Sequence, residues 1–450
     1  MSMKRSAEDF LDQWKIRSDR KPLILRGARQ VGKSYLIKAW GAENFETVIH
    51  IDLEREAIWF KSLKSKDPKA IIQEISLLKN QKIVPGSSLL FFDEVQACPE
   101  LLPALRYFYE NLPSLHVIAA GSLLDFALAD ISEPMPVGRI EYLYLHPLSF
   151  GEFVQAAHSE ELSNILSGIR PPQQISSTTH QMLLGLLREY YFVGGMPEAV
   201  AIYLQNRDLL DVQRVQSNIL ATMQDDFSKY NTRLDPQVLR TVFTYAVQNP
   251  ARRSKFVDVA REFRSQQLKL AFRLLEMARI VHLVRWSAGN GVPLAAEQKE
   301  DRFKPIFLDI GLSNRACQVP LIADLTQLLT VRAGALAEQF VGQELLHSFQ
   351  PFEDGKLYYW QREALNSSAE IDFLSESAGQ VIPIEVKAAR GNTLRSLHSF
   401  IREKKKVKLA LRLSTREMAT ESLKVTGSPE LSCQLISLPL YMAAQSRSLT

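Results

Sequence analysis

The stretch at residues 27–34, Gly-Ala-Arg-Gln-Val-Gly-Lys-Ser, constrains the fold of this chain more than any other feature. An apolar run at residues 22–25 precedes it, and a helix-like run at residues 35–40 follows it. Two glycines with four residues between them, followed by lysine and serine and placed between a strand and a helix, are typical of a phosphate-binding loop. The glycines let backbone N–H groups approach phosphate oxygens, and the helix N-terminus adds positive potential. We therefore expect the chain to bind a nucleoside triphosphate, ATP with Mg²⁺.

Each side chain of this loop has an expected place around the nucleotide. Lys33 is expected to reach the β- and γ-phosphates, and Ser34 to ligate Mg²⁺. Arg29, although it belongs to the loop, is expected to be structural or exposed rather than catalytic. The residues expected to contact the nucleotide are Gly27, Ala28, Arg29, Gln30, Val31, Gly32, Lys33, Ser34 and Tyr35.

A second signal follows the loop in the order that ATP hydrolysis needs. The apolar run at residues 89–92 ends in Asp93 and Glu94. Asp93 can hold the Mg²⁺, and Glu94 can polarise the attacking water. Two acids at a strand end can also form a mere solvated turn, but their position after the phosphate loop favours the catalytic interpretation.

Two further residues are candidates for contact with the γ-phosphate. Ser122 follows the apolar run at residues 116–120, and its alternative role is a helix N-cap. Arg139 can supply positive charge in its own chain or to a second subunit, and its alternative is a surface salt bridge. We assign Glu94, Lys33, Ser122 and Arg139 to the catalytic machinery.

The order of apolar runs predicts an α/β fold. Strand-like runs at residues 47–51, 88–92 and 116–120 alternate with helix-like segments, which favours a parallel sheet covered on both faces. The three cysteines show no zinc spacing or disulfide framework, and no apolar run approaches the roughly 20 residues that span a bilayer. We expect a cytoplasmic protein without a membrane contact. The net charge of +4 permits a nucleic-acid partner but does not require one.

The rest of the chain predicts two more domains. From residue 181 to 285 the pattern is mainly helical. A helix beginning at 256–260, a second at 268–276, a strand at 280–285 and a Gly/Pro-rich tip at 287–302 follow the order of a winged helix. A helix at 333–349 and strands at 356–360, 371–374 and 381–387 come next. The expected domains are 1–160, 180–325 and 326–450.

Taken together, these residues resemble a prokaryotic AAA-type ATPase family with a C-terminal domain of the DUF4143 type. The similarity lies in residues 26–34, 92–96, 121–122, 138–139, 145–153, 191–198, 304–312, 359–360, 370–373 and 385–387. The resemblance implies ATP binding and hydrolysis, a winged-helix-like middle domain and a restriction-nuclease-like C-terminal fold. Ser34 in place of threonine, and residues 192–193 before Gly194, depart slightly from the commonest family pattern.

The C-terminal acids suggest a second chemistry. Asp372, Glu385 and Lys387 have the Asp-x12-Glu-x-Lys spacing of restriction-nuclease-like folds. Glu385 and Lys387 share one face of a strand, and Glu338 lies on the preceding helix. Glu338, Asp372 and Glu385 are candidates for a nuclease Mg²⁺, with Lys387 catalytic. The alternative is a wet strand face or an inactive relative that kept only the scaffold.

These observations lead to one hypothesis and two rivals. The leading hypothesis is an ATP-driven switch coupled to a nuclease-like domain that acts on DNA in processing or defence. The rivals are a signalling or scaffold ATPase with an inactive nuclease-like domain, and an ATP-driven remodeller of protein complexes. The basic runs at residues 252–255 and 402–408 could contact phosphates. Homo-oligomers and protein partners are compatible with all three.

Overall fold

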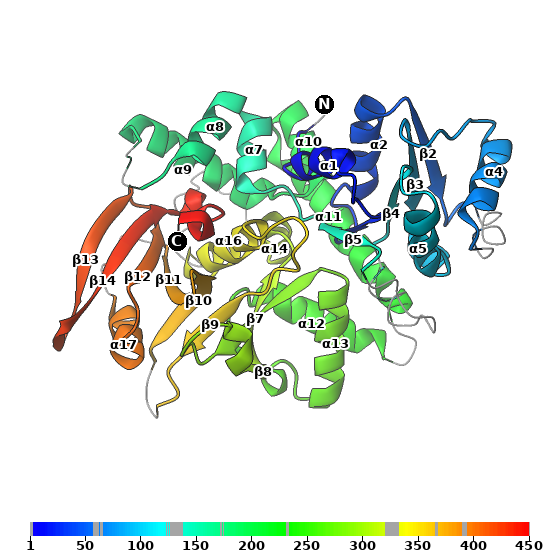
Figure 1. The fold of residues 1–450 in the computed structure, drawn as a ribbon. Helices are drawn as coiled ribbons and strands as arrows, with labels where there is room; N and C mark the ends of the chain where they lie inside the picture. Colours follow the sequence, from blue (N-terminus) through cyan, green and yellow to red (C-terminus); the bar gives the residue numbers. More distant parts are fainter. Residues whose placement is uncertain are drawn as a thin grey trace.

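The structure is a computed structural model, and Figure 1 shows its fold. It describes residues 3–56, 63, 66–122, 124, 126, 138–171, 173, 175–230, 234–319, 333–364, 368–388 and 394–449. Two sheets lie on opposite sides of the molecule in this view, and helices from the middle of the chain lie between and above them.

The first sheet has five strands, all parallel, in the order β2-β3-β4-β1-β5. They are β1 (Leu23–Arg26), β2 (Thr47–Asp52), β3 (Ser88–Asp93), β4 (His116–Ala120) and β5 (Glu141–Tyr144). Every residue of β3 and β4 is buried, as their continuous apolar sequences require. The expected parallel α/β core is therefore confirmed, and the carboxyl ends of its strands lie along one edge.

Helices cover both faces of this sheet. Leu25 and Phe91 share one apolar core with α1 (Ala7–Ile16) and α2 (Lys33–Asn44). Ile24 and Phe92, their neighbours in sequence, share a different core with α4 (Pro68–Lys79) and α5 (Leu101–Asn111). The period of two along each strand divides the residues between the two cores.

A set of helices follows the five-stranded sheet. They are α7 (Phe150–Ala157), α8 (Glu160–Gly168), α9 (Ser177–Val193), α10 (Pro197–Asn206) and α11 (Leu209–Asp225). Ser149 and Glu152 form a capping box that fixes the start of α7. Figure 1 shows α7, α8 and α9 along the top of the molecule, between the two sheets.

The next segment has helices and a hairpin in the expected order, with two differences. It contains α12 (Pro236–Gln248), β6 (Ser254–Lys255), α13 (Ser265–Met277), β7 (Val281–Ser287) and β8 (Gln298–Phe307). The helix expected to begin at residue 256 is only a 3-10 turn, Phe256–Asp258, and the preceding full helix is α12. The expected second helix and hairpin are present as α13, β7 and β8, but the tip expected at 287–302 is shorter because β8 begins at residue 298.

The second sheet has nine strands and joins the middle of the chain to its C-terminal part. Its order is β13-β14-β12-β11-β10-β9-β7-β8-β6, and β7 pairs with β9 in parallel. The C-terminal strands are β9 (Tyr358–Gln361), β10 (Glu370–Ser377), β11 (Gln380–Lys387), β12 (Leu409–Ser414), β13 (Ala419–Val425) and β14 (Ser428–Pro439). The expected boundary at 325–326 lies outside the described residues, but one sheet spans both expected domains.

Helices cover the two faces of the large sheet, and one of them connects the parts of the chain. Residues of α16 (Ala333–His347) belong to the same apolar core as α1 and β1, which also takes in α14 (Ile310–Ala316). Residues of α17 (Arg395–Lys404) belong to a separate core on the other face. The five-stranded sheet and the nine-stranded sheet therefore share a continuous apolar core through α16.

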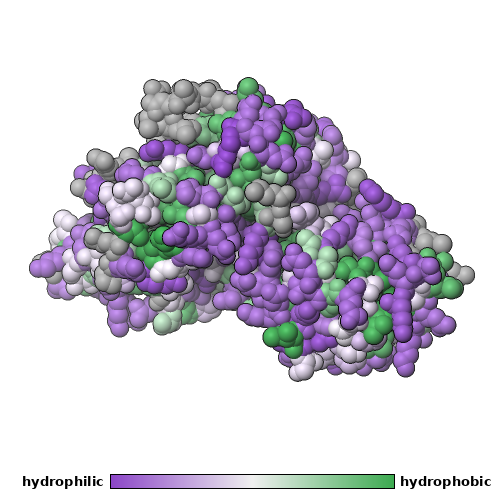
Figure 2. Space-filling view, turned by 90° about the horizontal axis from the view of Figure 1, so that it is seen from above, coloured by the Kyte–Doolittle hydropathy of each residue, from purple (hydrophilic) through white to green (hydrophobic). Residues whose placement is uncertain are grey.

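The surface seen from above is mainly hydrophilic, with smaller apolar patches (Figure 2). Among the described residues, no helix combines the length and apolar character that crossing a membrane requires.

Candidate ATP site and C-terminal acid cluster

The phosphate loop connects β1 to α2 in a conformation that requires its glycines. Gly27, Gln30 and Gly32 have φ values of 156°, 63° and 92°. A Cβ atom on Gly27 would lie 2.3 Å from the carbonyl oxygen of Leu145, so no other residue fits there. Gly32 caps the N-terminus of α2, which leaves the first N–H groups of this helix directed toward the loop.

Lys33 is held inside the loop by its own backbone. Its Nζ donates hydrogen bonds to the carbonyl oxygens of Gly27 at 2.9 Å and Ala28 at 2.7 Å. Burial lowers the pKa of Lys33 to about 8, while the nearby carboxylates of Glu94 and Asp93 act in the opposite direction. The ammonium group is therefore charged at neutral pH and positioned where phosphates would replace its carbonyl partners.

Ser34 and Asp93 meet at the carboxyl end of β3. Burial alone would raise the pKa of Asp93, but hydrogen bonds from His50 and Ser34 lower it below its usual value. The His50 Nε2 lies 3.3 Å from Asp93 Oδ2. A hydroxyl and an ionised carboxylate side by side are the oxygen ligands that Mg²⁺ takes beside phosphates, so these residues fit the metal.

Glu94 follows directly and has a fixed carboxylate. Its φ of 53° turns the chain out of β3, and its Oε2 accepts a hydrogen bond from Gln96 Nε2 at 2.6 Å. The Glu94 carboxylate is near enough to Lys33 to raise the pKa of its ammonium group. The position fits a residue that orients water next to bound phosphates.

Arg29 connects the loop to two distant parts of the chain. Its Nε donates to Ser122 Oγ at 3.1 Å, and its guanidinium forms an ion pair with Asp226. Asp226 lies directly after α11, 197 positions along the chain, and it is 5% exposed. Ser122 is thus beside Arg29 of the loop, and Arg29 has a bridging position.

Arg139 does not reach the loop within this chain. Its Nε lies 3.1 Å from Glu110 Oε1, and its guanidinium lies 5.8 Å from the centre of the Tyr109 ring. These contacts correspond to the surface salt bridge that is the alternative for this residue.

One segment singled out by the family resemblance packs against the loop, and a second packs against the first. A Cβ atom on Gly32 would lie 3.4 Å from Pro197 Cγ. The nearby Gly195 N–H donates to Asp309 Oδ2 at 2.6 Å, and Asp309 caps α14. Residues 191–198, which include Gly195 and Pro197, therefore join the phosphate loop to the segment that follows β8.

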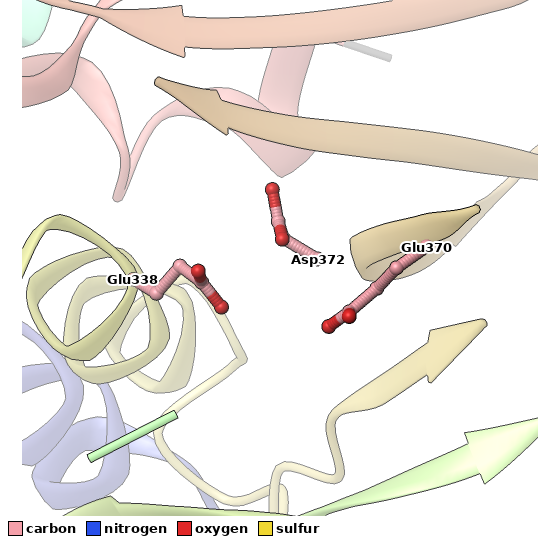
Figure 3. Close-up of side chains that lie close together, drawn as sticks. All are labelled: Glu338, Glu370 and Asp372. Atoms are coloured by element: carbon pink, nitrogen blue, oxygen red, sulfur yellow. The ribbon is translucent and has the colours of Figure 1, made fainter. Parts of the chain in front are cut away.

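The C-terminal acids converge between α16 and β10 (Figure 3). One carboxylate oxygen from each of Glu338, Glu370 and Asp372 lies within 4.8 Å of the others. Glu338 and Asp372 are expected members of this cluster. Glu370 was not assigned to it, although it lies two residues before Asp372 on one strand and therefore shares its face.

A lysine from the hairpin enters the same cluster. The Nζ of Lys304 lies 2.9 Å from Glu338 Oε2 and 3.6 Å from Asp372 Oδ1, and it also pairs with Glu370. Lys304 is completely buried. Despite this burial, the surrounding acids raise the pKa of Lys304, so its ammonium stays charged.

Glu385 and Lys387 lie beside these acids, as their spacing predicts. Lys387 Nζ lies 2.5 Å from Glu385 Oε1, while Glu385 Oε2 is buried without a hydrogen-bond partner among the described residues. Asp372 Oδ2 accepts a hydrogen bond from the backbone N–H of Val386 at 2.7 Å.

The cluster holds more negative than positive side chains. Four acids (Glu338, Glu370, Asp372 and Glu385) face three bases (Lys304, Lys387 and Arg253). Burial and repulsion from Asp372 raise the pKa of Glu338 to about 8, and the same causes raise that of Glu385 to about 7. A proton retained among these carboxyl groups therefore reduces the surplus of negative charge.

Carboxylate oxygens suit Mg²⁺ or Mn²⁺ in ligand type. In this arrangement, however, Lys304 takes the position between Glu338 and Glu370. The cluster as formed does not fit a divalent ion unless Lys304 moves away. The spacing of the acids alone gives no sign of Lys304, since it lies 34 positions before Glu338 on a separate element.

Family profiles match three parts of the chain. The family described as an AAA domain matches residues 19–154. A domain of unknown function, DUF8612, matches residues 184–323, and a second, DUF4143, matches residues 333–433. No curated protein matches the chain.

Solved structures show distant similarity. The Walker-type ATPase paby2304 of Pyrococcus abyssi is 17% identical with a TM-score of 0.44, covering 70% of this chain and 96% of that one. The ORC2 protein of Aeropyrum pernix is 10% identical with a TM-score of 0.37, covering 74% and 95%. A RuvB variant of Thermotoga maritima is 14% identical with a TM-score of 0.30, covering 66% and 89%. These values carry no conclusion about activity.

The AAA family match and the resemblance seen in the sequence agree with each other and with the five-stranded parallel sheet. Residues 19–154 therefore contain an AAA domain with a phosphate loop, and the DUF8612 and DUF4143 matches follow it at residues 184–323 and 333–433.

Proposed function

We propose that the chain is an ATP-hydrolysing switch, in which Arg29 passes the nucleotide state of the phosphate loop to the helices that follow the ATPase sheet. The contact of Arg29 with both Ser122 and Asp226 carries this proposal. A γ-phosphate beside Ser122 would compete with Asp226 for the guanidinium, because arginine pairs with either anion. The contact between Arg29 and the end of α11 would therefore differ between the ATP-bound and ADP-bound states.

The loop residues have defined roles in this proposal. Lys33 and the N–H groups of the loop would bind the phosphates, and Ser34 and Asp93 would hold Mg²⁺. Bound Mg²⁺ would neutralise charge on the phosphate oxygens. Glu94, held by Gln96, would orient the attacking water. A role for Arg139 in catalysis requires a second copy of the chain, because its own contacts are with Glu110 and Tyr109.

Helix α16 supplies a route from the ATPase part to the acid cluster. Buried side chains of this one helix bond to three separate segments: Glu344 accepts from the Phe150 N–H at 3.0 Å, and Gln343 accepts from the Ile310 N–H at 2.9 Å and donates to the Tyr190 hydroxyl at 2.8 Å. Glu338 lies on the same helix. A movement of α16 would therefore change the distance between Glu338 and Lys304.

For the C-terminal domain, the position of Lys304 favours the scaffold alternative over a metal-dependent nuclease. The nuclease remains a second candidate because Oε2 of buried Glu385 has no hydrogen-bond partner among the described residues, and Asp372 lies near enough to raise the pKa of Glu385. If the domain cleaves DNA, a role in DNA processing or defence follows. If it does not, a role in binding a partner follows. We also propose a reducing, cytoplasmic setting, because the three cysteines are far apart in the sequence and odd in number, without a disulfide framework.

ATP turnover tests the ATPase roles. Lys33→Ala should lose nucleotide affinity, and Glu94→Gln should keep ATP binding while slowing turnover at least 100-fold, on the order of one general-base contribution. Glu74→Gln, which changes an exposed carboxylate on α4, is the matched control and should keep full activity. Unchanged turnover in Glu94→Gln would contradict the assignment.

Incubation with DNA tests the C-terminal domain. Purified protein is mixed with plasmid and short linear DNA, with Mg²⁺ or Mn²⁺, in the presence and absence of ATP. Cleavage that both Glu385→Ala and Lys387→Ala abolish would establish the nuclease. No cleavage with either metal would leave the scaffold role.

A further inference from the structure

A cavity of about 810 Å³ lies where three parts of the chain meet, and neither the phosphate loop nor the acid cluster lines it. Its walls come from the end of β1, from α13 and β7, and from the segment at residues 354–358 that leads into β9 (Figure 1). This volume is within the range of sites that bind small molecules or segments of larger ones.

The cavity has a surplus of positive charge. Six basic side chains line it: Arg26, Lys269, Arg273, Arg279, Arg285 and Lys356. Three carboxylates line it too, and each already has a partner: Glu276 with Arg285 at 2.7 Å, Glu300 with Lys269 at 2.8 Å, and Asp354 with Arg279 at 2.5 Å. His282 adds no charge at neutral pH, because burial lowers its pKa to about 4. The six bases less the three acids leave a surplus of three charges.

Two of the basic side chains are available to a ligand. Arg273 and Lys356 are exposed, and neither forms an ion pair with any residue that the structure describes. Phe272, Met277 and Leu283 form an apolar part of the wall. An anion can therefore contact basic groups while an attached ring or chain covers the apolar surface.

We propose that this cavity binds a ligand with at least two phosphate groups, either the backbone of single-stranded nucleic acid or a free polyphosphate. Guanidinium groups suit phosphate oxygens because their N–H groups match two oxygens at once. Two or three phosphates balance the surplus of three charges. This site is separate from the basic runs at 252–255 and 402–408, and the proposal does not depend on ATP hydrolysis.

The cavity also has a direct connection to the ATP site. Arg26 is the last residue of β1 and immediately precedes Gly27 of the phosphate loop. Its guanidinium lies 4.1 Å from the centre of the Tyr142 ring of β5. A ligand that draws Arg26 toward the cavity would alter the loop, and by linkage nucleotide binding would alter the affinity of the ligand equally.

Fluorescence anisotropy with a labelled single-stranded oligonucleotide tests the proposal, with saturating Mg²⁺ and ADP present to fill the phosphate loop. Inorganic tripolyphosphate is added as a competitor. With a surplus of three charges and about 0.7 counterions released per contact, affinity should fall on the order of 18-fold between 50 and 200 mM salt. Competition by tripolyphosphate would identify phosphate groups as sufficient, and oligonucleotide binding that resists it would identify the nucleic-acid backbone.

Variants locate the binding. Arg273→Glu combined with Lys356→Glu turns the surplus of three into a deficit of one and should weaken binding at least tenfold. Arg402→Glu combined with Lys406→Glu reverses two exposed charges around α17 and should leave affinity within about twofold. Binding of neither probe to the unmodified protein, or an equal loss in both variants, would overturn the proposal. Because these are binding measurements, they stand whether or not the protein hydrolyses ATP.

Discussion

Replacing Lys304 with methionine tests the account of the acid cluster. The substitution keeps a long unbranched side chain and removes the buried cation that contacts Glu338, Glu370 and Asp372. Removing one partner of a buried ion pair costs about 3–5 kcal/mol, because the remaining charge is left uncompensated. In a cooperative unit of roughly 150–250 residues, this corresponds to a fall in Tm of about 6–20 °C.

The loss of stability in Lys304→Met should depend on pH, and the direction of this dependence follows from the pKa of Glu338. Its folded-state pKa of about 8 lies above the ordinary value of 4.5. A group whose pKa is raised by folding stabilises the folded state fully at pH values below its unfolded-state pKa. This stabilisation is lost as the pH rises through its folded-state pKa. Without Lys304 the acids repel one another more strongly once ionised. The deficit of Lys304→Met should thus be small near pH 5 and largest at pH 8.

Thermal unfolding at pH 5 and pH 8, followed by circular dichroism, measures the effect. Adding Glu338→Gln to Lys304→Met removes one negative charge and should recover part of the lost Tm at pH 8. A Tm within 2 °C of the unmodified protein at both pH values would refute the reasoning. So would a deficit that is larger at pH 5 than at pH 8.

Two further substitutions test the contacts around the phosphate loop. Gly194→Ala should lower Tm by several degrees, because Gly194 has a φ of 71° and the new Cβ would lie 2.1 Å from Asp309 Oδ1. The control is Gly185→Ala in α9, where the new Cβ would have no atom within 4 Å. This control should be neutral or stabilising by about 1 kcal/mol. Arg5→Met should raise the KM for ATP several-fold and lower Tm, because Arg5 donates to the Val31 carbonyl of the loop at 3.2 Å and pairs with buried Glu152 at 3.3 Å. Adding Glu152→Gln should recover Tm but not the KM, and recovery of both would contradict the role of Arg5 in holding the loop.

The sequence allowed the ATPase part to be predicted because its signals are local. A strand, a glycine loop and a helix follow one another within residues 22–44, so spacing alone predicts their geometry. The strand that ends in Asp93 is also recognisable from its apolar run. In the C-terminal part, alternation along β11 correctly placed Glu385 and Lys387 on one face.

Contacts between distant segments could not be predicted in this way. The bridge from Arg29 to Asp226 joins residues 197 positions apart, and no periodicity relates them. Lys304 enters the acid cluster because β7, next to β8, pairs with β9, which places the hairpin in the same sheet as β10. Arg253, assigned to a basic run, instead pairs with Glu370 at 2.9 Å. These arrangements follow from the order of strands in the nine-stranded sheet.

Hydrogen exchange at the end of α11 tests the switch most directly. The protein with Glu94→Gln, which should hold ATP without turnover, is compared with ATP and with ADP by mass spectrometry over residues 219–228. The account predicts several-fold different exchange in the two states, and it predicts that Asp226→Asn abolishes the difference while ATP still binds. Equal exchange with ATP and ADP, or a difference that persists in Asp226→Asn, would contradict a switch that acts through Arg29.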